Sequence, residues 1–523
     1  MRQFRLWTAM AAALALAACG MGDEEAAADG AGDLAGRGGW PTNGDGNGAG
    51  GAGGTGGGSW QDGEQYTSYG ENEFTDPAED NLCTFGVDVD TASYAIMRRD
   101  VTAGALPVSA GVRTEEYVNY FDYGYEPPAA DAADAFAVHL DGAPSPFGEG
   151  LQLLRIGIKG KELAAPERGR ANLVFLVDVS GSMGEANKLP LVQAALRLLV
   201  DELRPDDTIG LVAYAGTAGV VLEPTAVAER QTILTAIDQL RSGGSTNGEA
   251  GIRSAYDLAG EHFAQDGINR VILCTDGDLN VGLTGDALIA LIEEYRSRGV
   301  YLTTLGFGSG NYNDALMEQL ADKGNGNYAY VDSMAEAERV LRRDLLGTLV
   351  VIAKDVKIQV AIDPEAVARY RLLGYENRAI DDEQFEDPSV DTGDIGSGHD
   401  VTALIELELK PEVHEPGAIA ANVATVSLRY KKPDHSTDTE LQRSISVSGF
   451  ATSFTAAPES LRFAAAVAEY AEILRRSQFA EGARFADLLE IAGDATADGD
   501  PDRLEFIELG AKAKGLWELR YGR

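Results

Sequence analysis

Cysteine and histidine are scarce in this chain, which has three cysteines and five histidines in 523 residues. Cys19 lies near the N-terminus, before the predicted folded part, so only Cys83 and Cys274 remain for that part, a poor basis for the disulfide framework of a small secreted domain. The histidines lack the spacing of a zinc site. We therefore expect a fold that rests on hydrophobic cores, and at this length on two or three of them.

Basic side chains are also few. The chain has 43 Lys and Arg against 83 Asp and Glu, which gives a formal net charge of -40. The acidic residues are spread along the chain rather than gathered in one tail, and such a field repels nucleic acid while it keeps divalent cations near the surface. We expect no nucleic-acid partner. The charge itself indicates solubility and metal tolerance.

Motifs of enzymes and cofactor sites are missing. The sequence has no Gly-x-Ser-x-Gly elbow, no His-Glu-x-x-His helix and no Cys-His pairing typical of a hydrolase. The segment GFGSGN at 306–311 follows a predicted strand, but its glycine spacing differs from that of a dinucleotide-binding loop. The sequence thus predicts no catalytic residues and no small-molecule cofactor, and we expect that the protein is not an enzyme.

The N-terminus has the pattern of an export signal. Arg2 and Arg5 precede an apolar run over 6–18, which is too short to cross a bilayer as a mature helix. We therefore expect a signal peptide over residues 1–18 that is removed on export.

The segment LAAC at 16–19 resembles the bacterial lipobox, in which the cysteine becomes the new N-terminus and carries acyl chains. Two or more acyl chains anchor a protein stably in a membrane. We expect lipidation of Cys19. Because Gly20 follows it, where retention in the inner membrane would favour Asp, we expect an outer-membrane location that faces the periplasm or the cell surface.

Glycine, alanine and acidic residues dominate from residue 20 to about residue 81, without apolar periodicity. Such a composition cannot bury enough apolar surface to offset chain entropy. We predict a disordered, Gly-rich tether over residues 19–81 that presents the folded part away from the membrane.

Segments rich in branched and apolar residues lie on both sides of a central unit, at 134–142 and 151–161 before it and in four runs after residue 350. This distribution predicts a β-sandwich that is built from two separate parts of the chain. The expected regions are an N-terminal flanking region, the central domain, further sandwich strands and a C-terminal helical region, at 82–167, 168–350, 351–452 and 453–523.

The central unit alternates strands and helices. Short apolar runs at 172–177, 208–213, 270–275 and 300–306 are typical of strands that are buried on both faces of a parallel sheet. The predicted fold class is α/β: a doubly wound, mostly parallel sheet inserted in a discontinuous β-sandwich, with C-terminal helices. The ligand crevice of such a sheet lies at the carboxyl ends of its strands.

Oxygen-bearing side chains follow these strand ends. Asp178, Ser180 and Ser182 follow the first strand, Asp276 follows the strand that ends at residue 275, and Thr246 lies in the loop GGSTNG before a helix. Each piece alone is ordinary turn or capping chemistry. Mg²⁺ takes about six oxygen ligands and readily keeps waters, so the three pieces together predict a site for Mg²⁺, or for Mn²⁺ or Ca²⁺.

This set resembles the metal-ion-dependent adhesion site of von Willebrand factor type A domains. The resemblance implies that the hydroxyls of Ser180 and Ser182 bind the ion directly, that Thr246 binds it in the ligand-bound state, and that Asp178 and Asp276 act mostly through water. Neutral direct ligands leave the ion with excess positive charge and an open position. The implied partner is a protein that presents an Asp or Glu.

The flanking regions extend the resemblance. FGVDVDTASYAIMRRDVTAGALP with EEYVNYFDYGY, and AKDVKIQVAIDPEAVARYRLLGYENRAI after the central unit, are similar to regions of a bacterial family of exported type A domain lipoproteins. The resemblance covers about residues 80 to 520. It implies an architecture and carries no defined biochemical activity.

A second candidate metal site lies near the C-terminus, where oxygen-bearing side chains fall at the ligand positions of an EF-hand loop and Gly499 falls at its sixth position. Pro501 replaces the usual apolar residue, so an acidic turn between two helices is the alternative to a calcium loop. The side chains of this candidate calcium loop are Asp494, Thr496, Asp498, Asp500, Asp502 and Glu505.

From these observations we expect a membrane-anchored, Mg²⁺-dependent adhesion or scaffolding lipoprotein of the cell envelope. Two alternatives remain open. One is a hydrolase that uses the same ion as a Lewis acid, for which the sequence shows no general base. The other is a structural envelope scaffold whose metal site is vestigial.

Overall fold

The computed structural model describes residues 58–522, except residues 62, 88–89, 164–168, 278–285, 311, 346, 348, 388–389, 391, 415–420, 434–437 and 497–498. The predicted signal peptide and Cys19 lie outside these residues. No helix among the described residues is both long enough and apolar enough to cross a membrane.

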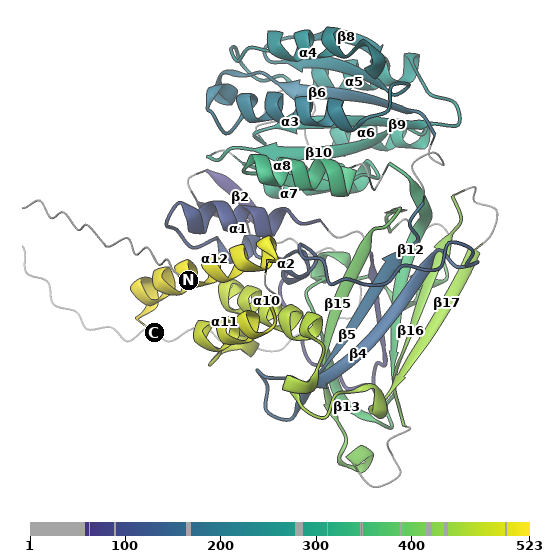
Figure 1. Ribbon diagram of the computed structural model, residues 1–523, viewed down its shortest axis with the longest axis vertical. Coiled ribbons are helices and arrows are strands. Elements are labelled where there is room, and N and C mark those ends of the chain that lie inside the picture. Colours follow the sequence, from purple (N-terminus) through teal and green to yellow (C-terminus); the bar gives the residue numbers. More distant parts are fainter. Residues whose placement is uncertain are drawn as a thin grey trace, which may run out of the picture. The chain divides into compact units, whose positions relative to one another are not determined.

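The central part of the chain forms a six-stranded sheet in the order β11-β10-β9-β6-β7-β8 (Figure 1). All pairings are parallel except that of β8 with β7. The strands are β6 (Ala171–Asp178), β7 (Thr208–Tyr214), β8 (Ala218–Ala226), β9 (Ile268–Thr275), β10 (Tyr301–Phe307) and β11 (Tyr328–Val331).

Helices cover both faces of this sheet, because its strands are apolar on both sides. Alternate residues of β6 face two different cores: Phe175 packs with α3, α4 and α8, and Leu176 packs with α5, α6 and α7. The sheet is therefore doubly wound, as the sequence predicts. The helices are α3 (Leu189–Glu202), α4 (Arg230–Gln239), α5 (Gly248–Glu261), α6 (Asp286–Ser297), α7 (Asp314–Lys323) and α8 (Met334–Arg339).

Two antiparallel sheets enclose a second core. One has the order β13-β15-β5-β4, and the other has the order β14-β12-β16-β17 with β3 paired to β12. Ile156 of β5 and Ile358 of β12 belong to the same buried cluster, so strands from both sides of the central domain form one sandwich, as predicted. The strands are β3 (Leu82–Gly86), β4 (Phe136–Pro144), β5 (Leu151–Gly160), β12 (Val351–Ile362), β13 (Val367–Leu373), β14 (Ile395–Gly396), β15 (Asp400–Leu409), β16 (Asn422–Lys431) and β17 (Asp438–Ser446).

A helical core joins the two ends of the described chain. Tyr94 and Phe121 from the N-terminal flank pack with Phe463 and Phe506 from the C-terminal region. The predicted C-terminal helices are present, and they share their core with residues that lie more than 300 positions earlier. The helices are α1 (Ala92–Thr102), α2 (Thr114–Val118), α10 (Glu459–Arg475), α11 (Phe485–Asp494) and α12 (Pro501–Tyr521).

The last part of the predicted tether is folded, which corrects the expectation of a disordered segment up to residue 81. Strands β1 (Gly58–Gln61) and β2 (Glu64–Thr67) form an antiparallel hairpin. Tyr66 is only 2% exposed and lies against Gly111. The sequence contains Asp-Gly at 62–63, a dipeptide that favours hairpins, but its glycine-rich surroundings hide this signal.

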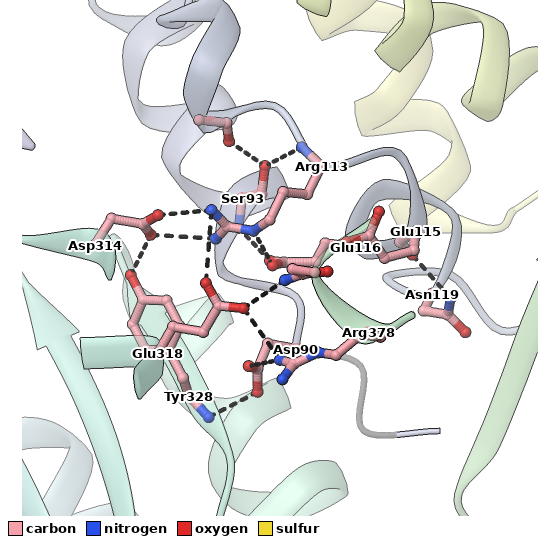
Figure 2. Close-up of polar contacts among 12 residues, drawn as sticks. Asp90, Ser93, Arg113, Glu115, Glu116, Asn119, Asp314, Glu318, Tyr328 and Arg378 are labelled. Atoms are coloured by element: carbon pink, nitrogen blue, oxygen red, sulfur yellow. Dashed lines mark hydrogen bonds and ion pairs between the residues drawn. The ribbon is translucent and has the colours of Figure 1, made fainter. Parts of the chain in front are cut away.

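Buried ion pairs connect the N-terminal flank, the central domain and the sandwich (Figure 2). Arg113 donates two hydrogen bonds to Asp314 at the start of α7, at 2.6 and 3.2 Å, and also pairs with Glu116. Arg378, which follows β13, donates to Glu318 of α7 at 3.1 Å. Helix α7 is thus held by charged side chains from two other parts of the chain.

Candidate metal centre

The candidate site lies where the order of the central sheet reverses. From β6 the chain continues to β7 on one side, and it later returns to place β9 and then β10 on the other side. The carboxyl ends of β6 and β9 are therefore neighbours, and loops that leave such ends in opposite directions form the crevice in which doubly wound sheets bind ligands. Asp178 is the last residue of β6, and Asp276 directly follows β9.

Asp178 is fully buried and is held by hydrogen bonds. Its Oδ1 accepts from the Ser180 backbone N–H at 2.8 Å, and its Oδ2 accepts from the Thr275 hydroxyl at 3.0 Å and the Tyr214 hydroxyl at 3.3 Å. Burial raises the pKa of the Asp178 carboxyl to about 6, because the charged form loses water. Hydrogen bonds fix the orientation of this carboxylate, and a nearby cation would favour its charged form.

The two serines lie side by side, with their hydroxyl oxygens 3.0 Å apart. Ser180 is buried and Ser182 is exposed, so the pair reaches from the interior to the surface. The backbone N–H of Gly181 donates to the Gly244 carbonyl at 3.0 Å, which ties the loop that carries Thr246 to the serine loop. Gly244 has a φ of +90°, a conformation that favours glycine.

Asp276 is 4% exposed, and its two oxygens differ in their surroundings. Oδ2 accepts from the Lys188 ammonium at 3.0 Å. Oδ1 is buried and has no hydrogen-bond partner among the described residues. Buried polar atoms in native proteins nearly always have a partner, such as protein, water or an ion, so this oxygen fits a centre that holds a hydrated cation.

The structure brings four of the five predicted residues to one edge of the sheet, with Asp178, Ser180 and Ser182 at the end of β6 and Asp276 at the end of the neighbouring β9. The fifth, Thr246, lies two residues after Gly244, whose carbonyl accepts from Gly181. The structure also shows three side chains that the sequence analysis missed. Thr275 ends one predicted strand and Tyr214 directly follows another, so both could have been suspected from their positions. Lys188 precedes a helix, and no motif marks it.

Among the described residues, no cluster of three or more His, Cys, Asp or Glu side chains could hold a metal ion. The candidate centre does not depend on such a cluster, because it combines two carboxylates with hydroxyl oxygens. Hard oxygen donors of this kind suit Mg²⁺.

The candidate calcium loop has the contacts of a turn between helices. Asp500 caps α12 and accepts from the backbone N–H of Asp502 and Arg503, each at 3.1 Å. The Thr496 hydroxyl donates to a carbonyl of α11 at 2.7 Å, and Glu505 lies 3.4 Å from Arg98. Asp494 ends α11. Asp498 lies outside the described residues, so calcium binding here stays a prediction.

Comparison with known proteins defines the class of the central domain. The family model of the von Willebrand factor type A domain matches residues 172–343. A model described as von Willebrand factor matches residues 60–155, and one described as the C-terminal part of the uncharacterized protein YfbK matches residues 347–516. The chain is therefore a type A domain protein, and the sequence-based resemblance is confirmed.

The chain belongs to the family of YfbK. It is 38% identical to the uncharacterized protein YfbK of Escherichia coli (strain K12) over 476 residues, which cover 87% of this chain and 82% of that protein. It is also 31% identical over 174 residues to a UPF0353 protein of Mycobacterium sp. (strain KMS), covering 30% of this chain and 51% of that protein.

Among solved structures, the chain is similar to a von Willebrand factor type A protein from Catenulispora acidiphila. That match has 16% identity and a TM-score of 0.42, and it covers 74% of this chain and 91% of that chain.

Proposed function

We propose that this protein is a lipid-anchored adhesion or scaffolding protein of the cell envelope that captures an acidic group of a protein partner through a bound Mg²⁺. The observation that carries the proposal is that Oδ1 of Asp276, buried beside the strand end that holds Asp178, has no hydrogen-bond partner within the part of the chain that the structure describes. A buried carboxylate oxygen without a partner costs about 1–3 kcal/mol or more, which a cation or its bound water would offset.

The residues that would hold the ion are those of the two adjoining loops and the β9 end: Asp178, Ser180, Ser182, Thr246 and Asp276. When bound, Mg²⁺ supplies a positive charge and coordination positions for oxygen ligands. Hydrogen bonds from the Thr275 and Tyr214 hydroxyls orient the Asp178 carboxylate. A carboxylate from an Asp or Glu of a partner is the oxygen ligand that such a charge favours.

The test is calorimetric titration of the full chain with Mg²⁺. Asp178→Ala should abolish high-affinity binding, and Asp178→Asn, which keeps the shape of the side chain, should do the same. Asp201→Ala is the matched control, because Asp201 is an exposed acid on α3 of the same domain. Unchanged Mg²⁺ affinity in a folded Asp178→Ala protein would show that the site assignment is wrong.

Binding of an envelope partner should depend on this centre. Capture of a partner from envelope extract should be lost with chelator, restored by Mg²⁺ and absent with Asp178→Ala. Turnover of a peptide or phosphoester library that depends on Asp178 would instead favour the hydrolase alternative. Partner binding that persists with chelator would favour a scaffold whose metal site is vestigial.

The lipid anchor is a separate part of the proposal and rests on the LAAC segment at 16–19. Cys19→Ser should release the exported protein from the membrane fraction of a bacterium that expresses it, because the acyl chains would have no attachment site. A Cys83→Ser protein should remain in the membrane fraction. If the Cys19→Ser protein also remains there, another anchor exists.

A further inference from the structure

Lys188 is a buried lysine inside the candidate metal centre. It is 5% exposed, and its ammonium lies 3.0 Å from Oδ2 of Asp276. Its backbone is fixed at the start of α3, where its carbonyl accepts from the Val192 N–H at 2.9 Å.

The stem of Lys188 runs along a glycine. A Cβ on Gly308, which has a φ of +75°, would lie only 2.3 Å from Lys188 Cε. The absence of a side chain at this position leaves the space that the lysine stem fills. Lys188 is therefore held in place along its whole length, from its backbone to its ammonium group.

This lysine changes the charge balance of the centre. The centre contains two buried carboxylates, Asp178 and Asp276, and one ammonium, which contacts Asp276; the side chains that donate hydrogen bonds to Oδ2 of Asp178 are neutral hydroxyls. The three charged groups together carry one negative charge. A divalent cation would bring this set to one positive charge, whereas the same set without Lys188 would become neutral.

We propose that the charge of Lys188 sets the affinities of this centre for the divalent cation and for the acidic ligand in opposite directions. Its positive charge weakens the binding of the divalent cation and strengthens the binding of a carboxylate to the metal-loaded centre. This inference rests on the proposed Mg²⁺ site, and it assigns Lys188 a positioning and charge-setting role.

The inference predicts opposite shifts in two affinities. Lys188→Met, whose unbranched side chain can still lie along Gly308, should bind Mg²⁺ roughly tenfold or more tightly than the unmodified protein, because it removes an elementary positive charge that lies 3.0 Å from Asp276, a residue that would hold the ion. Acetate binding to the Mn²⁺-loaded protein, measured by the loss of water-proton relaxation enhancement, should become roughly tenfold weaker. Loss of packing alone would not produce these opposite shifts.

Two further variants make the test specific. Lys188→Gln can still donate a hydrogen bond to Asp276 but carries no charge. Because the charge is what the proposal invokes, this variant should shift both affinities in the same directions as Lys188→Met. Lys323→Met removes an exposed charge from α7 of the same domain and should leave both affinities within about twofold.

The possible outcomes separate the two proposals. If the unmodified protein does not bind Mg²⁺, the proposed function fails. If it binds Mg²⁺ but both neutral variants bind it equally or more weakly, the Mg²⁺ site stands and the role of Lys188 is overturned. The role is also overturned if neither neutral variant folds by circular dichroism, because Lys188 would then be a structural residue.

Discussion

Arg113 is the residue on which the joint between the N-terminal flank and α7 depends. Its side chain is 5% exposed and contacts Glu116, Asp314 and, at 4.0 Å, Glu318. These three acids are themselves almost completely buried. A buried ion pair contributes little compared with a well-packed apolar contact, but the loss of one partner leaves an uncompensated charge in the interior.

Replacement of this arginine should therefore be costly. Arg113→Met should lower the free energy of unfolding by about 3–5 kcal/mol, measured by denaturant titration with circular dichroism. Adding Asp314→Asn should restore part of the loss, because it removes one of the unpaired charges. Arg484→Met is the control: Arg484 is exposed and pairs with Asp487 at 2.7 Å, so its loss should cost at most about 0.5 kcal/mol. A small effect of Arg113→Met would mean that water reaches the acidic side chains around Arg113 and solvates their charges.

At the scale of elements, the N-terminal hairpin supports one wall of the candidate metal centre. The backbone N–H of Gln65 in β2 donates to the Tyr312 carbonyl at 2.9 Å, in the segment that joins β10 to α7. The same segment also contacts Gly277, which follows Asp276, since a Cβ on Gly277 would lie 2.8 Å from the Asn313 nitrogen. The side chain of Asn313 caps α7 by accepting from the Leu316 N–H at 3.1 Å. The hairpin thus contacts the connecting segment, and the connecting segment contacts the residue that follows Asp276.

Loss of the contact between the hairpin and the connecting segment should lower the Mg²⁺ affinity of the centre. Gln65→Pro removes the N–H that Tyr312 accepts from, so it should weaken Mg²⁺ binding severalfold and cost about 1–2 kcal/mol of stability. Gln65→Ala keeps the N–H of an exposed residue and should behave like the unmodified protein. Calorimetry and thermal melting of the two variants give the comparison. Equal Mg²⁺ affinity of the two variants would show that the hairpin does not support the centre.

Strong periodicity made most elements predictable. The apolar runs of the central domain correspond to β6, β7, β9 and β10, and the residue types at their ends led to the candidate site. The missed elements have weak local patterns: β8 is an edge strand with mostly half-exposed residues, and β11 has four residues. Lys188 was missed because its position depends on packing against Gly308, which lies 120 residues away in the sequence.

At the scale of the whole molecule, the sandwich depends on both flanks of the type A domain. In one sheet, β5 from the N-terminal flank lies between β4 and β15, and β15 follows the type A domain in the chain. In the other sheet, β3 pairs with β12 across residues 357–361. This interleaving could be predicted from strand-like runs on both flanks, but the pairing order could not, because each run has a similar apolar pattern.

The interleaved sandwich leads to a prediction about fragments. Residues 168–350 contain the complete doubly wound sheet with helices on both faces, so this fragment should fold and bind Mg²⁺. Residues 351–523 alone lack β3, β4 and β5, which reduces one sheet to the β13–β15 pair and removes buried residues such as Phe85 and Ile156 from the sandwich core. An isolated two-stranded ribbon is at best marginally stable in water. The C-terminal helices also lose Tyr94 and Phe121 from their core. The fragment 351–523 should therefore be poorly ordered by circular dichroism, and it should regain structure when residues 58–167 are added. A sharp cooperative melt of the isolated fragment would instead show that the C-terminal part folds as an independent domain.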